Sequence, residues 1–224
     1  MVAALTLKPS PRARAMRLRV DSRTGAVVLT YPRRTSERRA LDWAKSQGAW
    51  IEAQLAKVPA PAPIAADAEI PLEGVPHIID WQPGRPRTVR VEEGRILLGG
   101  PADTVEPRLT RWLKQHALRT LDLETRAYAE NAGVTVSRVA VGDPLSRWGS
   151  CSFSGAIRYS WRLILAPDWV RRATVAHEVA HRVHMNHGPD FHALVETLLG
   201  ADPKPARLWL KREGAALHRI GRIR

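Results

Sequence analysis

Histidines gather in the segment AHEVAHRVHMNHGPDFHAL, residues 176–194, and part of this segment has a spacing that suits metal chemistry. His177, Glu178 and His181 form an H-E-x-x-H sequence. Residues four apart on a helix project from one face, so the two imidazoles can reach one Zn²⁺ at about 2.0–2.1 Å each. Glu178 then lies beside the ion, where it can take a proton from the attacking water and pass it to a leaving group. The chemistry that this pattern predicts is metal-assisted hydrolysis.

The residues around the motif predict the helix that it needs. Pro167 and Asp168 favour a helix start, and the segment 168–185 is apolar at most positions outside the motif. A short H-E-x-x-H also arises by chance on a solvated helix face. We favour a metal site, because His and Glu side chains on a buried helix cost free energy unless they have partners.

A catalytic zinc site has three protein ligands and one open position, so a third ligand is needed. His184 lies about 10.5 Å further along a straight helix than His177, which excludes it. His187 follows a break expected at residues 185–186, and a turn there brings it back to the ion. The run has the spacing of metzincin metallopeptidases, except that His184 stands where those enzymes have glycine.

Glu196, on the next predicted helix, is the alternative third ligand. Spacing favours His187 over Glu196 without deciding between them. His184 and His192 are interpreted as partly exposed helix residues, although either one could orient a ligand through a hydrogen bond.

A second cluster of functional residue types, RWGSC at 147–151, leads into a strand predicted just before the metal helix. The free edge of such a strand can pair with an extended substrate, and Arg147 can neutralise a carboxylate or phosphate or stabilise an oxyanion. The alternative is structural, with Arg147 stacked on Trp148 beside a tight glycine turn. The residues alone leave open whether Arg147 and Trp148 bind substrate. The lone Cys151 is interpreted as a small buried hydrophobe.

The elements that must position these residues divide into two predicted domains. Residues 1–104 read as a β-rich subdomain with one helix. Its expected parts are a hairpin over 12–31, a helix over 35–57 that Gly48 kinks or divides, a Pro- and Ala-rich linker over 58–68 and short strands over 69–99.

Residues 105–224 form the predicted catalytic domain. We expect a long amphipathic helix over 107–133, a strand after it, two strands joined by a turn at residues 154–155, the motif helix, a helix over 189–200 and a basic helical tail. The fold class that follows is α+β.

Composition indicates the compartment and the class of partner to expect. The 224 residues carry a formal charge of +13 and one cysteine. No apolar run spans a membrane, no secretory signal pattern begins the chain, and no disulfide can form within it, so we expect a cytoplasmic protein. The charge favours anionic partners such as nucleic acid or nucleotides, yet a general bias towards arginine would produce it without any such partner.

Several motifs, in sequence order, resemble the YgjP-like metal-dependent hydrolases, relatives of the SprT-like and Wss1-like zinc metallopeptidases. The shared features are R-W-G-S-C, W-R-L-I-x-A-P, H-E-x-x-H, and N-H followed by an aromatic residue. They stand here at residues 147–151, 161–167, 177–181, 186–187 and Phe191. Weaker matches at RARAMRLRV, GAWI and IPLEG extend the resemblance over most of the chain.

This resemblance implies a zincin-like catalytic fold with His177, His181 and His187 as metal ligands and Glu178 as the base. It supports His187 over Glu196. Val179 and Ser160 depart from the leucine and asparagine usual in that family, and neither touches the metal chemistry.

The leading hypothesis is a zinc-dependent peptidase that uses water and a glutamate base, with another divalent transition metal as an alternative ion. A second hypothesis keeps the metal and changes the substrate to a nucleoside triphosphate or another phosphate ester. A third is a protease of the SprT-like kind that acts on DNA-bound proteins. A structural zinc module fits less well, because three ligands and a placed glutamate are the arrangement of an open catalytic site.

Overall fold

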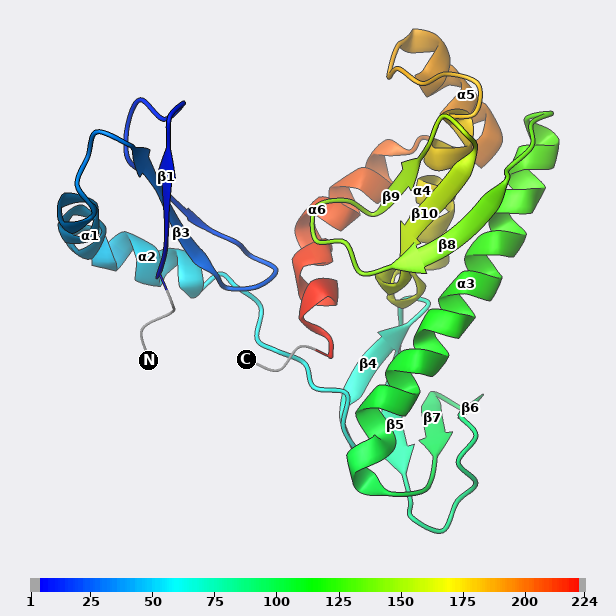
Figure 1. Cartoon of the computed structure of the whole chain (residues 1–224). Coiled ribbons are helices and arrows are strands. Elements are labelled where there is room, and N and C mark those ends of the chain that lie inside the picture. The colour runs from blue at the N-terminus through cyan, green and yellow to red at the C-terminus, as the bar shows by residue number, and fades with distance from the viewer. Residues whose placement is uncertain (1–4, 222–224) are drawn as a thin grey trace. The chain divides into compact units, whose positions relative to one another are not determined.

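The computed structural model describes residues 5–221, and packing divides the chain into two compact units, residues 1–60 and 61–224 (Figure 1). Its described part holds six α-helices and three small sheets, which confirms the α+β class. Among the described residues, no helix combines the length and apolar character needed to cross a membrane.

The first unit is a three-stranded sheet with two helices: β1 (Leu5–Ser10), β2 (Arg17–Val20), β3 (Val27–Pro32), α1 (Glu37–Ser46) and α2 (Gly48–Leu55). The predicted hairpin is present, since β2 and β3 pair antiparallel around a turn in which Gly25 has a φ of 73°. β1 pairs parallel with β3, which no local pattern predicts, and gives the order β1-β3-β2. The predicted helix is divided next to Gly48. Leu29, Tyr31, Ala40 and Ala44 form the core between the sheet and α1.

Asp21 closes the turn of this hairpin. Its carboxylate accepts hydrogen bonds from the guanidinium and backbone N–H of Arg23 and from the guanidinium of Arg19. The Arg23 side chain, more than any other group, holds the pKa of Asp21 well below its usual range. Because the folded-state pKa is depressed, the contribution to stability is present above the unfolded-state pKa of about 3.9 and is lost on acidification.

We therefore expect Asp21→Asn to lower the free energy of unfolding by about 1 kcal/mol at neutral pH and by less in strong acid. Urea unfolding at both pH values measures the difference. An equal loss at both would contradict this account of Asp21.

The second unit contains two sheets, in the orders β4-β5-β7-β6 and β8-β10-β9. Its strands are β4 (Glu69–Leu72), β5 (Val75–Trp81), β6 (Arg90–Glu92), β7 (Arg95–Leu98), β8 (Arg138–Gly142), β9 (Gly149–Cys151) and β10 (Ala156–Ser160). Its helices are α3 (Val105–Asn131), α4 (Asp168–Ala180), α5 (Pro189–Leu199) and α6 (Lys204–Arg219), with short 3₁₀ turns η1 (Ala102–Thr104) and η2 (Trp161–Leu165). The hairpins predicted around Gly94 and Gly155 are both present, and each of these glycines has a positive φ.

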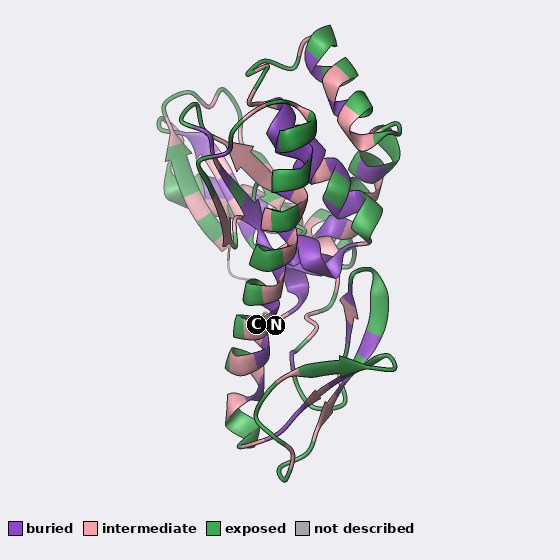
Figure 2. Cartoon of the chain, turned by 90° about the vertical axis from the view of Figure 1, so that its right-hand side faces the viewer, coloured by how far each residue is buried: buried purple, intermediate pink, exposed green. Residues whose placement is uncertain are grey.

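The long helix α3 organises the core of the second unit. Its buried positions repeat at three- and four-residue steps, as the amphipathic pattern predicts. They include Leu109, Leu113, Ala117, Leu121 and Tyr128. Figure 2 shows this buried stripe in purple along α3 and continuing into the elements that pack on it. The neighbours of α3 are η2, α4 and β8, so this helix supports the elements that surround the H-E-x-x-H motif.

The strands β4 to β7 belong to this same unit. Ile70, Ile79 and Ile96 are fully buried and share one hydrophobic core with Leu109 and Leu113 of α3. The sequence places a boundary at residues 104–105, whereas the packing divides the chain after residue 60. The reason is that the apolar face of this small sheet is buried against helices that come later in the chain.

Arg162, the arginine of the W-R-L-I-x-A-P segment, is a structural anchor. Its guanidinium is buried and donates to the carboxylate of Asp143 and to the backbone carbonyls of Leu217 and Ile220, at 2.6–2.7 Å for the closest contacts. It also lies over the Trp161 ring. One side chain thus joins η2, the segment after β8 and the end of α6.

We expect Arg162→Met to lower the free energy of unfolding by about 3 kcal/mol, because it leaves two buried carbonyls and a carboxylate without their donor. Thermal unfolding measures the loss. Arg138→Met, on the exposed side of β8, is the matched control and should change stability by less than about 0.5 kcal/mol. Similar melting temperatures for the two variants would contradict the anchoring role.

Candidate metal centre

Helix α4 carries the motif but is shorter than the sequence predicts. It ends at Ala180, with His181 as its C-cap, whereas the expected break lay at residues 185–186. The chain turns at once, because the N–H groups of Arg182 and Val183 bond back three residues. The Arg182 guanidinium donates to the carbonyls of Thr135 and Phe153. These bonds to distant segments support the early turn, and local sequence patterns do not reveal them.

The structure brings His177, His181 and His187 together. One nitrogen from each ring belongs to a group whose members all lie within 4.8 Å of one another, and Nε2 of His177 is 3.2 Å from Nε2 of His187. His177 and His181 project from the same face of α4, as predicted, and His187 returns to them from the loop before α5. Glu196, the alternative ligand, is exposed on α5 and lies outside the group.

This donor set fits a divalent metal ion. Two nitrogen ligands of one tetrahedral ion lie about 3.3 Å apart when each metal–nitrogen distance is 2.0–2.1 Å, close to the observed 3.2 Å separation. Nδ1 of His181 lies 3.1 Å from the carbonyl of His184, so its N–H can donate there and leave Nε2 free as a ligand. His184 therefore contributes through its backbone, which sequence reasoning missed.

Burial and neighbouring groups keep His177 and His181 in the form that binds metal. Burial, and then the neighbouring His181 and His187, lower the pKa of His177 to about 4. Burial also lowers the pKa of His181. Both imidazoles are therefore neutral at physiological pH, with a lone pair available to a cation.

Phe191 positions the three rings. Its side chain is fully buried at the start of α5, and its ring centroid is 4.9 Å from that of His177, 4.6 Å from that of His181 and 4.7 Å from that of His187. A rigid aromatic ring in contact with all three imidazoles restricts their rotation. The sequence shows Phe191 only as the aromatic residue of a motif, without this role.

Glu178 lies beside the histidines and is 5% exposed. Burial raises its pKa to about 7, and the charge of Arg147 acts in the opposite direction. Strand β9 passes against this carboxylate: a Cβ atom on Gly149 would lie 2.6 Å from Cγ and 2.7 Å from Cδ of Glu178. The glycine of RWGSC is therefore part of a strand and makes room for Glu178, whereas the structural alternative considered from the sequence placed a tight turn there.

Arg147 and Trp148 lie at a cavity of about 260 Å³ that His177 and Glu178 also line. Arg147 is exposed, and Trp148 is half-buried with its ring 4.8 Å from that of His218. Trp148 thus packs on α6, and Arg147 remains at the cavity. His192 and Arg207 line the same cavity from α5 and α6.

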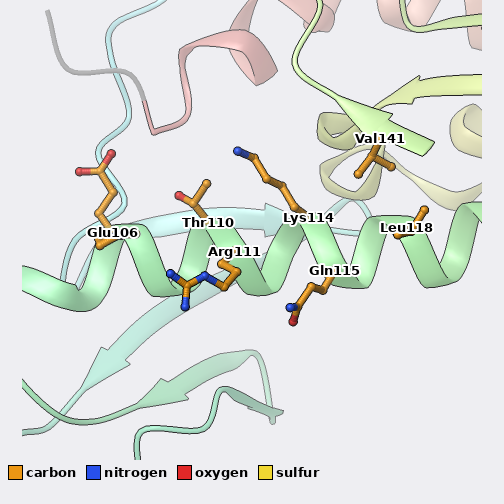
Figure 3. Close-up of a pocket in the computed structure, with 8 residues that line it drawn as sticks. Glu106, Thr110, Arg111, Lys114, Gln115, Leu118 and Val141 are labelled. Atoms are coloured by element: carbon orange, nitrogen blue, oxygen red, sulfur yellow. The ribbon is translucent and has the colours of Figure 1, made fainter.

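A larger hollow of about 730 Å³ follows the surface of α3. Figure 3 shows Glu106, Thr110 and Lys114 on one side of the helix and Arg111 and Gln115 on the other. This hollow is an open depression along one helix, and its lining contains no histidine or cysteine. The smaller cavity beside Glu178 is the one with groups for metal chemistry.

Comparison with known proteins agrees with this geometry. A family model described as YgjP-like, metallopeptidase domain, matches residues 14–213. No curated protein and no solved structure matches the chain. The matched segment covers most of the chain and includes the three histidines, Glu178 and the RWGSC strand. The chain therefore belongs to the YgjP-like family.

Proposed function

We propose that this chain is a zinc-dependent peptidase of zincin-like architecture, in which α3, the sheet β8-β10-β9 and α4 build the reaction centre. The observation that carries the proposal is the convergence of His177, His181 and His187 beside the buried carboxylate of Glu178. Three imidazoles leave one position of a tetrahedral ion open, as catalytic rather than structural sites do.

The three histidines would hold the ion, and Glu178 would move the proton. A bound divalent ion supplies Lewis-acid chemistry that polarises the scissile carbonyl and makes water more acidic. Glu178 accepts a proton from the attacking water and donates it to the nitrogen of the leaving amine. The raised pKa of Glu178, about 7, suits both halves of this task near neutral pH. Zinc suits three imidazoles best, and other divalent transition metals can also bind such a set.

Strand β9 supports a peptide as the substrate. It is one of the two edge strands in the order β8-β10-β9, and Glu178 lies against its Gly149. An edge strand offers backbone groups that can pair with an extended chain. A peptide aligned on β9 would place a carbonyl near Glu178 and the histidines.

Arg147 and Arg207 favour a second candidate, hydrolysis of a phosphate ester or nucleoside triphosphate. Both arginines line the cavity next to Glu178. Guanidinium groups match phosphate oxygens in pairs, so the same centre could act on a phosphoryl group.

Hydrolysis in ¹⁸O-labelled water separates the two candidates. The zinc-loaded chain is incubated with a reduced, alkylated protein and, separately, with the four ribonucleoside triphosphates, and the products are weighed by mass spectrometry. We expect the label in new peptide carboxyl groups and no release of phosphate or pyrophosphate. Label in phosphate, without peptide cleavage, would replace the first candidate by the second. Failure of both substrates with a fully zinc-loaded chain would contradict the proposed function.

A further inference from the structure

Positive charge is concentrated in the first unit. Residues 1–60 contain 12 Lys and Arg against 4 Asp and Glu, so a quarter of the chain carries eight of its 13 net positive charges. The metal centre lies in the other unit. The residues that carry this excess charge are therefore not among the histidines of the metal centre or the residues that line its cavity.

The topology of the sheet gathers much of this charge at one end. β1 and β3 are parallel with Ser10 opposite Pro32, so the segments that follow them, residues 11–16 and 33–36, leave from the same end of the sheet (Figure 1). β2 starts at this end, because Arg17 pairs with Thr30 near the end of β3. We call this cluster the arginine end. It consists of Lys8, Arg12, Arg14, Arg17, Arg33, Arg34, Arg38 and Arg39.

The side chains of the arginine end are available to a partner. All eight are exposed, and among residues 5–221 none of them forms an ion pair. By contrast, Arg19 and Arg23 at the opposite end of the hairpin both pair with Asp21. The acidic residue next to the cluster is Glu37. Eight like charges with so little compensation create a positive potential that attracts polyanions.

The residue types indicate which polyanion. Seven of the eight are arginines, whose planar guanidinium offers paired donors to phosphate oxygens. The cluster extends over two loops, two strands and a helix start, which suits a ligand with regularly repeated phosphates. Insertion into a lipid surface calls for exposed apolar side chains, and the one large exposed apolar residue in the described part of this unit, Trp50, lies on α2 outside the cluster.

We propose that the arginine end binds the phosphodiester backbone of nucleic acid without sequence preference. This activity is separate from the proposed hydrolysis, because it uses residues of the other unit. Contacts of this kind hold the backbone and do not read bases. Each phosphate that an arginine neutralises releases counterions, so the affinity must fall steeply with salt.

The test compares two full-length variants that lose the same charge. The first removes four residues of the arginine end: Arg12→Gln, Arg14→Gln, Arg33→Gln and Arg34→Gln. The control removes four exposed basic residues of the second unit: Arg90→Gln, Arg111→Gln, Arg119→Gln and Lys211→Gln. Fluorescence anisotropy with a labelled DNA duplex and a single strand, each about 30 nucleotides long, gives affinities between about 50 and about 200 mM salt.

We expect the wild type to bind. The first variant should lose at least about tenfold in affinity, and its slope of log affinity against log salt should be about 3 smaller in magnitude. The affinity of the control should change by less than about threefold. No binding by the wild type at the lowest salt, or equal losses in both variants, would overturn the proposal. The proposal would also be overturned if the wild type bound vesicles with about one-third phosphatidylserine more tightly than it binds DNA and the first variant lost this binding. That result would assign the surface to lipid. If the first variant unfolds at a lower temperature than wild type, a milder variant with only Arg12→Gln and Arg34→Gln takes its place. That variant must still lose about threefold in affinity for nucleic acid.

Discussion

Replacing Glu178 by glutamine is expected to leave metal binding intact and to slow hydrolysis by about 10³-fold. Glutamine has the same shape, so it fits against Gly149 and leaves the three histidines undisturbed. Its amide cannot accept the proton of the attacking water or return it to the leaving group. The effect should therefore fall on kcat, with little change in the metal content of the protein.

Glu196→Gln is the matched control for this experiment. It makes the same chemical change at an exposed position of α5, outside the histidine group. We expect it to retain wild-type activity. If Glu178→Gln retained more than about a tenth of wild-type kcat with full metal content, the assignment of Glu178 as the base would be wrong.

Replacing Gly149 by alanine is expected to reduce kcat by about 10²-fold, although residue 149 supplies no reacting group. The added methyl group would lie 2.6–2.7 Å from Cγ and Cδ of Glu178, which is too close for carbon atoms. Either the carboxylate or strand β9 must move, and a shift of about 1 Å at a reacting group is enough for a loss of this size. The same crowding should lower the free energy of unfolding by about 1–3 kcal/mol.

A double substitution separates the clash from other effects of the methyl group. In a Glu178→Ala background the carboxylate is absent. Gly149→Ala should therefore lower the free energy of unfolding by much less there than it does in the wild type. Ser150→Ala, one position along β9, is the control and should keep both stability and activity near wild type. If Gly149→Ala costs as much stability in the Glu178→Ala background as in the wild type, contact with Glu178 is not the cause.

Local patterns predicted the elements whose signals lie within one segment. The hairpin over 12–31, the buried stripe of α3 and the common face of His177 and His181 depend on periodicity and turn residues, and the structure shows them. Spacing alone was not enough to predict the third histidine of the group. His187 reaches the group because α4 ends at Ala180, and that early turn is supported by bonds from Arg182 to segments about 30 and 47 residues away.

Other features were beyond prediction because they are contacts between distant segments. Gly149 is required by a carboxylate 29 positions later, and Phe191 packs against rings that belong to α4 and to the loop after it. The parallel pairing of β1 with β3 and the common core of β4–β7 with α3 are likewise long-range. A sequence shows the residue types at such positions, whereas the neighbours that give them a role appear only in the folded chain.

The central claim, that His177, His181 and His187 hold one metal ion, is tested most directly by metal content per chain. Wild type, His187→Ala and the control His192→Ala are loaded with zinc, dialysed against a competing chelator and measured by elemental analysis. We predict one zinc per chain for wild type and for His192→Ala, whose ring lies outside the group, and an affinity at least about 100-fold lower for His187→Ala. A folded wild type that takes up no metal, or a His187→Ala variant that retains it as well as wild type, would contradict the three-histidine site.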